Sequence, residues 1–148
     1  MSRLAALALL AAALVAGCGG GSSTAKLSHD DFVKKADAIC ADYNAKTAKL
    51  TRPSSYDAIA RYAQELQRIA ADAVGKFEGL NPPNDERANW KAFARSGDRL
   101  VATAKHLEQA ARKQDSAALG RILNEARKHS DESHRIGAAM GTPDCANT

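Results

Sequence analysis

A seam of small and apolar side chains between residues 84 and 112 constrains the fold of this chain more than any other feature. Its members recur at alternating steps of three and four residues: Trp90, Phe93, Gly97, Leu100, Ala104, Leu107 and Ala111. Because an α-helix turns once in about 3.6 residues, these side chains share one face of a single helix. Alternating steps of three and four are typical of helices that pack side by side. The segment therefore predicts a long helix inside a bundle.

Three further amphipathic segments, at about 29–50, 55–79 and 116–140, carry apolar residues at helical spacing. Ser28 precedes the first of them, and serine favours the N-cap position of a helix. A proline follows the first segment and a Pro-Pro pair follows the second, where neither can continue a helix. Four helices joined by short loops pack most economically in up-down-up-down order. We therefore predict an all-α, antiparallel up-down-up-down four-helix bundle over residues 28–148.

The N-terminus has the composition of a bacterial lipoprotein signal peptide. Arg3 provides the positive charge, and Leu4–Val15 is an apolar run too short to cross a bilayer, which takes about 20 residues. The tetrapeptide Val15-Ala16-Gly17-Cys18 resembles the bacterial lipobox, in which small residues precede a cysteine whose thiol receives a diacylglyceryl group before cleavage. We therefore predict that residues 1–17 are removed.

Cys18 would then be the lipidated N-terminus of the mature protein. The glycine-rich and serine-rich residues after it predict a flexible tether over residues 18–27 that holds the domain near the membrane. Together these features predict a protein on the extracytoplasmic face of the cell membrane, anchored there through Cys18. The alternative is an ordinary secretory signal peptide that is followed by an incidental cysteine.

The two remaining cysteines, Cys40 and Cys145, form an even pair in a compartment where disulfides persist. A bridge between them would close nearly the whole domain, which the chain-entropy model values at about 4 to 5 kcal/mol. Residues 141–144 would have to turn back along the bundle for Cys145 to reach Cys40. We therefore expect the C-terminal segment to lie across the first helix. The alternative is a pair of unbridged structural thiols.

Several segments together resemble small, uncharacterised secreted or lipid-anchored helical proteins of high-GC Gram-positive bacteria. The segments that carry the resemblance are the lipobox, Phe32 with Ala36–Cys40, Leu80–Pro83 and Gly141–Cys145. The resemblance covers nearly the whole mature domain and implies a helical bundle with a Cys40–Cys145 bridge. It implies no activity, because the matching segments are structural.

The charges of the chain give little indication of a partner. Its 21 Lys and Arg residues exceed its 17 Asp and Glu residues only slightly, and the two signs are interleaved throughout. Nucleic-acid binding requires basic residues gathered on one face or stripe. We therefore expect no nucleic-acid partner.

No motif for catalysis or for cofactor binding stands out. Of the four histidines only His129 lies near a predicted core face, and we expect it to contact Glu125 one turn earlier. Zinc sites, di-iron bundles and covalent haem each require ligand spacings that this chain lacks. We therefore expect no enzymatic activity, no metal and no other cofactor.

Trp90 has a packing interpretation. In an antiparallel bundle, Trp90 and Phe93 at the start of the third helix would lie beside Ser133, Gly137 and Met140 near the end of the fourth. Large side chains would then meet small ones, which favours packing over a ligand-stacking role for the tryptophan.

The sequence favours two functional hypotheses over the others. The first is a lipid-anchored lipoprotein that acts as an interaction or structural module of the cell envelope, with another envelope protein as its partner. The alternative is an extracytoplasmic binding protein for a small apolar or metal-containing ligand. That ligand would lie where Ser130, Ser133 and Gly137 thin the core opposite Trp90. An enzyme that uses surface carboxylates is a weaker third hypothesis, and the sequence predicts no oligomeric state.

Overall fold

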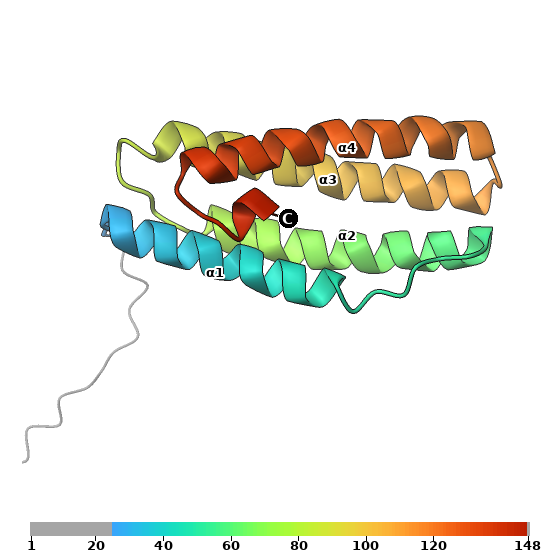
Figure 1. Cartoon of the computed structure of the whole chain (residues 1–148), viewed down its shortest axis with the longest axis horizontal. Helices are drawn as coiled ribbons and strands as arrows, with labels where there is room; N and C mark the ends of the chain where they lie inside the picture. The colour runs from blue at the N-terminus through green and yellow to red at the C-terminus, as the bar shows by residue number, and fades with distance from the viewer. Residues whose placement is uncertain (1–24, 148) are drawn as a thin grey trace, which may run out of the picture.

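The computed structural model of the chain describes residues 25–147. Its elements, in order, are α1 (His29–Thr47), α2 (Tyr56–Glu78), α3 (Arg87–Arg112), α4 (Ser116–Ala139) and the short 3-10 helix η1 (Cys145–Asn147). Figure 1 shows the four long helices side by side along one axis, each antiparallel to the next. The predicted all-α four-helix bundle is confirmed, and no strand occurs among the residues described. The predicted signal peptide and Cys18 lie outside those residues.

The helices begin and end close to their predicted limits. Ser28, Ser55 and Asp115 cap α1, α2 and α4, because each side chain accepts a hydrogen bond from the backbone N–H three residues further on. The largest differences are at the end of α1, which was expected to continue to about residue 50, and at the start of α3, expected near residue 84.

Both differences have local causes. The Thr47 hydroxyl donates to the backbone carbonyls of Tyr43 and Asn44, at 3.1 Å each. The backbone N–H of Leu50 then bonds the Thr47 carbonyl at 3.0 Å, so a tight turn replaces the last helical residues. Before α3, the backbone N–H of Arg87 points to the Asn84 carbonyl at 3.4 Å, which makes residues 84–87 a turn.

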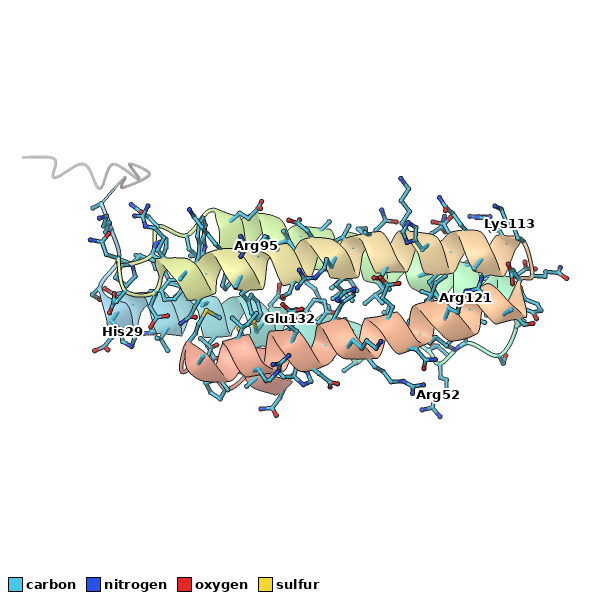
Figure 2. All side chains as sticks on the ribbon, turned by 90° about the horizontal axis from the view of Figure 1, so that it is seen from above. His29, Arg52, Arg95, Lys113, Arg121 and Glu132 are labelled. Carbon is cyan, nitrogen blue, oxygen red and sulfur yellow. A yellow bond between two sulfur atoms is a disulfide. The ribbon has the colours of Figure 1, made fainter. Side chains whose placement is uncertain are left out.

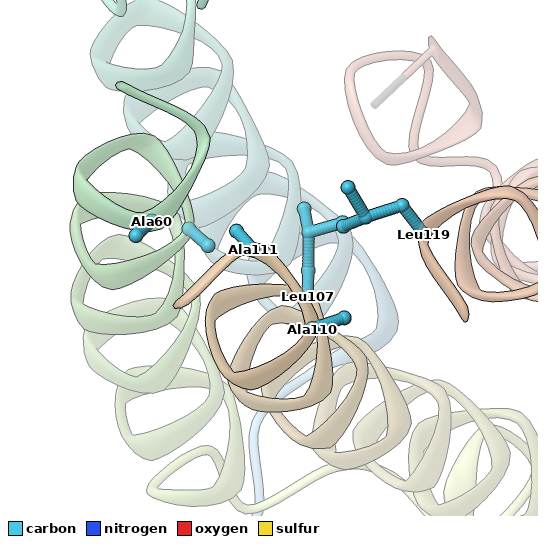
Figure 3. Packing of buried hydrophobic residues seen from close by; sticks show 6 residues of the cluster. Ala60, Leu107, Ala110, Ala111 and Leu119 are labelled. Carbon is cyan, nitrogen blue, oxygen red and sulfur yellow. The ribbon is translucent and has the colours of Figure 1, made fainter. Parts of the chain in front are cut away.

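The buried side chains form two clusters, one in each half of the bundle. The half that holds the start of α1 contains the aromatic residues, with Phe32, Ala36, Phe77, Ala94 and Met140 buried. The other half is built from alanine and leucine, as Figure 3 shows: Ala60, Ala63, Leu107, Ala110, Ala111 and Leu119. Small side chains allow α2 and α3 to pack closely, and one of the close contacts is at a glycine. A Cβ atom at Gly97 would lie 2.5 Å from Cγ2 of Val74.

Helix α1 covers only part of the bundle. It stops near the middle, and the following loop runs along the rest of α2 to the far end (Figure 1). The backbones of α1 and α4 are not adjacent; the C-terminal segment, residues 141–147, lies between them, and η1 contacts both. This segment therefore takes the place of a direct α1–α4 interface.

The start of the domain is fixed to the loop between α2 and α3. The backbone N–H of Leu27 donates to the Asn81 carbonyl at 2.9 Å, and the Lys26 amine donates to Oδ1 of Asn84 at 2.7 Å. Lys26 and Leu27 were expected to belong to a flexible tether; these two hydrogen bonds make them part of the domain. Figure 2 shows His29 at this end of the bundle and Lys113 at the opposite end.

Candidate functional site

The predicted bridge is present: Cys40 and Cys145 form a disulfide, with their Cα atoms 5.0 Å apart. Polar contacts hold the C-terminal segment beside it. The backbone N–H of Asp144 donates to Oδ1 of Asp37 at 2.7 Å, and the Asn44 side chain donates to the Asp144 carbonyl at 3.0 Å. The segment therefore lies across α1, as expected.

Gly137 faces the C-terminal segment rather than Trp90. A Cβ atom at this position would lie 2.6 Å from the carbonyl carbon of Cys145 and 2.7 Å from the backbone nitrogen of Ala146. The Gly137 carbonyl also accepts hydrogen bonds from the hydroxyl and the backbone N–H of buried Thr142, at 2.8 and 3.0 Å. The expectation that Gly137 makes room for Trp90 is therefore wrong, because the returning chain occupies that space.

Trp90 is a packing residue. Its indole Nε1 donates to the Phe77 carbonyl at 2.9 Å, near the C-terminal end of α2, and its ring packs against the aromatic cluster. The same carbonyl also accepts a hydrogen bond from the backbone N–H of Leu80 at 3.1 Å, so the indole adds a second donor at the end of α2. Trp90 lines neither of the cavities described below.

A cavity of about 60 Å³ lies between the two core clusters. All four helices contribute to its lining: Ile39, Cys40, Tyr43, Ala70, Ala73, Val74, Phe77, Phe93, Ala94, Ser96, Gly97, Leu100 and Ser133. We refer to it as the apolar cavity.

A second cavity of about 80 Å³ adjoins the first. Its lining consists of Tyr43, Leu100, His129, Ser130 and Ser133, and we refer to it as the polar cavity. Tyr43, Leu100 and Ser133 line both cavities, so the two are neighbours at these residues. The predicted thin region of the core at Ser130 and Ser133 therefore exists, although it lies beside Tyr43.

Most hydroxyl groups of the two cavities are already hydrogen-bonded. The Ser133 hydroxyl lies 2.9 Å from the Ser96 hydroxyl and 3.0 Å from the His129 carbonyl, and Ser96 donates to the Phe93 carbonyl at 2.8 Å. Tyr43 differs, because its hydroxyl makes no hydrogen bond with any residue that the structure describes. Burial, with a smaller contribution from neighbouring Tyr62, raises the pKa of Tyr43 to about 12. The phenol is therefore a protonated donor at neutral pH.

The histidine of the polar cavity has the predicted partner. Nε2 of His129 lies 3.5 Å from Oε1 of Glu125, one turn earlier on α4. Among residues 25–147 there is no group of three or more His, Cys, Asp or Glu side chains placed to hold a metal ion. Within the same range, no helix is both long and apolar enough to span a bilayer.

Four charged side chains tie the outer faces of α1 and α2 together. Lys46 lies 2.7 Å from Asp42 and 3.0 Å from Asp72, while Lys76 lies 2.8 Å from Asp72 and 3.3 Å from Asp42. Hydrogen bonds from Lys46 and then Lys76 lower the pKa of Asp42. Those from Lys76 and then Lys46 lower the pKa of Asp72. We call these four residues the ion-pair network.

Sequence reasoning missed Tyr43 and the alanines of α2 as parts of a cavity. By its spacing Tyr43 fits the apolar face of the first helix, and Ala70 and Ala73 fit the apolar face of the second. Helical spacing indicates that these residues face the core, but it does not show how far apart the helices stand at their level. Comparison with known proteins gives no match, whether to a family model, to a curated protein or to a solved structure.

Proposed function

We propose that this protein is a lipid-anchored lipoprotein on the extracytoplasmic face of the cell membrane, where it serves as an interaction or structural module of the envelope. The observation that carries the proposal is how the three cysteines are used. Two of them, Cys40 and Cys145, form a disulfide, and such bonds persist outside the cytosol. The third, Cys18, ends the tetrapeptide that resembles a lipobox.

The hydrogen bonds at the start of the domain identify which end of the bundle is nearest to the tether. Lys26 and Leu27 are hydrogen-bonded to the α2–α3 loop. A lipid at Cys18 would therefore keep that end of the bundle close to the bilayer. Helix α3 has 26 residues, so the opposite end of the bundle lies about 39 Å from the tethered end, at 1.5 Å per residue. Tyr56 and Leu123, the large apolar side chains most exposed in the described chain, lie in this outer half. The outer half is thus the part available to an envelope protein.

Membrane fractionation in a bacterial host that lipidates proteins tests the anchor. We expect the wild type to fractionate with membranes and the Cys18→Ala variant to lose that association. The matched control is the double variant Cys40→Ser/Cys145→Ser, which keeps Cys18 and loses only the bridge. The control should remain with the membranes. A Cys18→Ala protein that is still membrane-associated would contradict the anchor.

Chemical cross-linking in intact cells, followed by capture of the lipidated protein, tests the interaction role. We expect a reproducible envelope protein to be captured with the wild type and to be lost with Cys18→Ala, which leaves the membrane. Recovery of no reproducible partner from correctly anchored protein would contradict the role as an interaction module.

A further inference from the structure

We propose that the apolar and polar cavities together form a binding site for a small, neutral, single-ring aromatic molecule that carries one hydrogen-bond acceptor. The site does not depend on the lipid anchor, because every residue that lines it belongs to the four helices. Size, lining, charge and one free hydroxyl each restrict the ligand.

The available space fits one ring. The two cavities have volumes of about 60 and about 80 Å³, and Tyr43, Leu100 and Ser133 line both of them. An apolar protein cavity of about 150 Å³ admits benzene. The space is too small for a fused ring system or for a long acyl chain.

The walls of the apolar cavity favour an aromatic ring. Phe77 and Phe93 line it with their ring centroids 4.8 Å apart and their planes tilted by 40°. A third ring beside this pair gains the edge and offset contacts that aromatic groups prefer. Ala70 and Ala73 provide the room, because their side chains end at Cβ.

The ligand is neutral because the lining offers no counter-charge. No Lys, Arg, Asp or Glu side chain lines either cavity. A charged molecule would lose its water without gaining an ion pair, which is strongly unfavourable. His129, the titratable cavity residue besides Tyr43, already has Glu125 beside it.

Tyr43 supplies the polar contact. It lines both cavities, and its hydroxyl has no partner among the described residues, whereas the Ser96 and Ser133 hydroxyls are bonded. Tyr43 is half-buried, so a ligand acceptor in the cavity can replace solvent at this hydroxyl and gain one hydrogen bond. An oxygen on the ring, as in phenol, would satisfy it.

NMR titration tests the site. The mature chain with Cys18→Ala, which removes the lipid and keeps the disulfide, is titrated with phenol, with benzene and with benzoate as the charged probe. We expect saturable amide shifts for Tyr43, Leu100 and Ser133 with phenol and benzene, and none with benzoate. Absence of saturable shifts with both neutral probes would overturn the site, and saturable benzoate binding there would overturn the neutral class.

Three variants separate the contributions. Ala73→Leu fills the apolar cavity and should abolish the shifts, whereas Leu123→Ala, at an exposed position on α4, should leave them unchanged. Tyr43→Phe keeps the ring and should weaken phenol binding by about 2- to 10-fold, the worth of one hydrogen bond, with benzene binding unaffected. Phenol binding that is undiminished in Tyr43→Phe would overturn the role of the hydroxyl.

One measurement does not depend on the variants folding. Intermolecular nuclear Overhauser effects between bound phenol and the side chains of Phe93 and Leu100 place the ring directly. Their presence supports the site even where Ala73→Leu is unstable. Saturable binding without them, or binding that persists in a folded Ala73→Leu protein, overturns it.

Discussion

At the scale of single residues, glycine decides where the chain can pass close to itself. Gly137 lies against the backbone of Cys145 and Ala146, and Gly97 lies against Val74. Neither position has a positive φ, so the reason for glycine there is space. Gly120, on the same helix as Gly137, has nothing within 4 Å of the place a Cβ would take. The two glycines of α4 therefore make a matched pair.

Gly137→Ala should lower the free energy of unfolding by about 2 kcal/mol, because the new methyl group meets backbone that the disulfide holds in place. Gly120→Ala should raise it by about 0.5 to 1 kcal/mol through helix propensity. Denaturant unfolding of the oxidised proteins measures both. Equal effects of the two substitutions would contradict the close contact at Gly137.

The sequence could predict Trp90 as a packing residue but not its neighbours. A 3.6-residue period identifies which side chains face inward, and it does so along α3. On α4 it is wrong for Leu123, which fits the apolar face by its spacing and is exposed. It does not report which element arrives opposite them. The returning C-terminal segment was expected to cross the first helix, but helical spacing does not show that it also packs against Gly137 of α4.

At the scale of elements, the C-terminal segment replaces a helix–helix contact. It lies between α1 and α4, and it is joined to α1 by the Cys40–Cys145 bridge and by hydrogen bonds to Asp37 and from Asn44. On its other side α1 is joined to α2 by packing and by the ion-pair network. Helix α1 is therefore the element whose place depends most on these connections.

Removal of the bridge should act mainly on α1. The Cys40→Ser/Cys145→Ser variant should lose about 2 to 5 kcal/mol of stability, and hydrogen exchange should accelerate most in α1 and the C-terminal segment. Amides of α3 should change least, because α3 packs between α2 and α4. Equal acceleration in all four helices would show that α1 has no separate dependence on the bridge.

The ion-pair network predicts a dependence of stability on pH. The pKa values of Asp42 and Asp72 lie below their ordinary 3.8, so their stabilisation is complete above that value and is lost as the pH falls through the lower folded pKa. The pKa values of Lys46 and Lys76 lie above 10.5, so their stabilisation is lost as the pH rises beyond it.

Urea unfolding at a series of acidic pH values tests the network. Between about pH 5 and pH 2 the Asp42→Asn/Asp72→Asn protein should lose less stability than the wild type. Glu65→Gln is the control, because the Glu65–Arg68 pair stays within α2 and joins no other helix. The control should follow the wild-type acid dependence. Identical acid dependence in the wild type and the double aspartate variant would contradict the network.

At the scale of the whole molecule, the order of the helices and the bridge could be predicted from the sequence, whereas the cavities could not. Helical period, proline breaks and an even cysteine pair are local or countable signals. A cavity depends on how far several helices stand apart at one level, which follows from side chains on all of them. Tyr43 is an example. It lies one turn before the end of α1, and it lines both cavities together with Ser133 of α4, a neighbour that the spacing within α1 does not reveal.

The position of the proposed lipid anchor relative to the bundle is also a property of the whole molecule. The domain begins at Lys26 and Leu27, at the end of the bundle that carries the α2–α3 loop, so a lipid at Cys18 would hold that end nearest to the membrane. Exposure of this end to bulky water-soluble reagents should then be lower in the anchored protein than in Cys18→Ala. Lys91 near this end and Lys113 at the far end are suitable lysines for comparing amine labelling.

The states of the three cysteines are measured by intact-mass analysis of the protein purified from its native host, combined with thiol alkylation before and after reduction. We expect a mature N-terminus at Cys18 that carries a diacylglyceryl group, and we expect Cys40 and Cys145 to react with the alkylating reagent only after reduction. An unmodified Cys18, together with Cys40 and Cys145 that are both alkylated without reduction, would contradict both expectations.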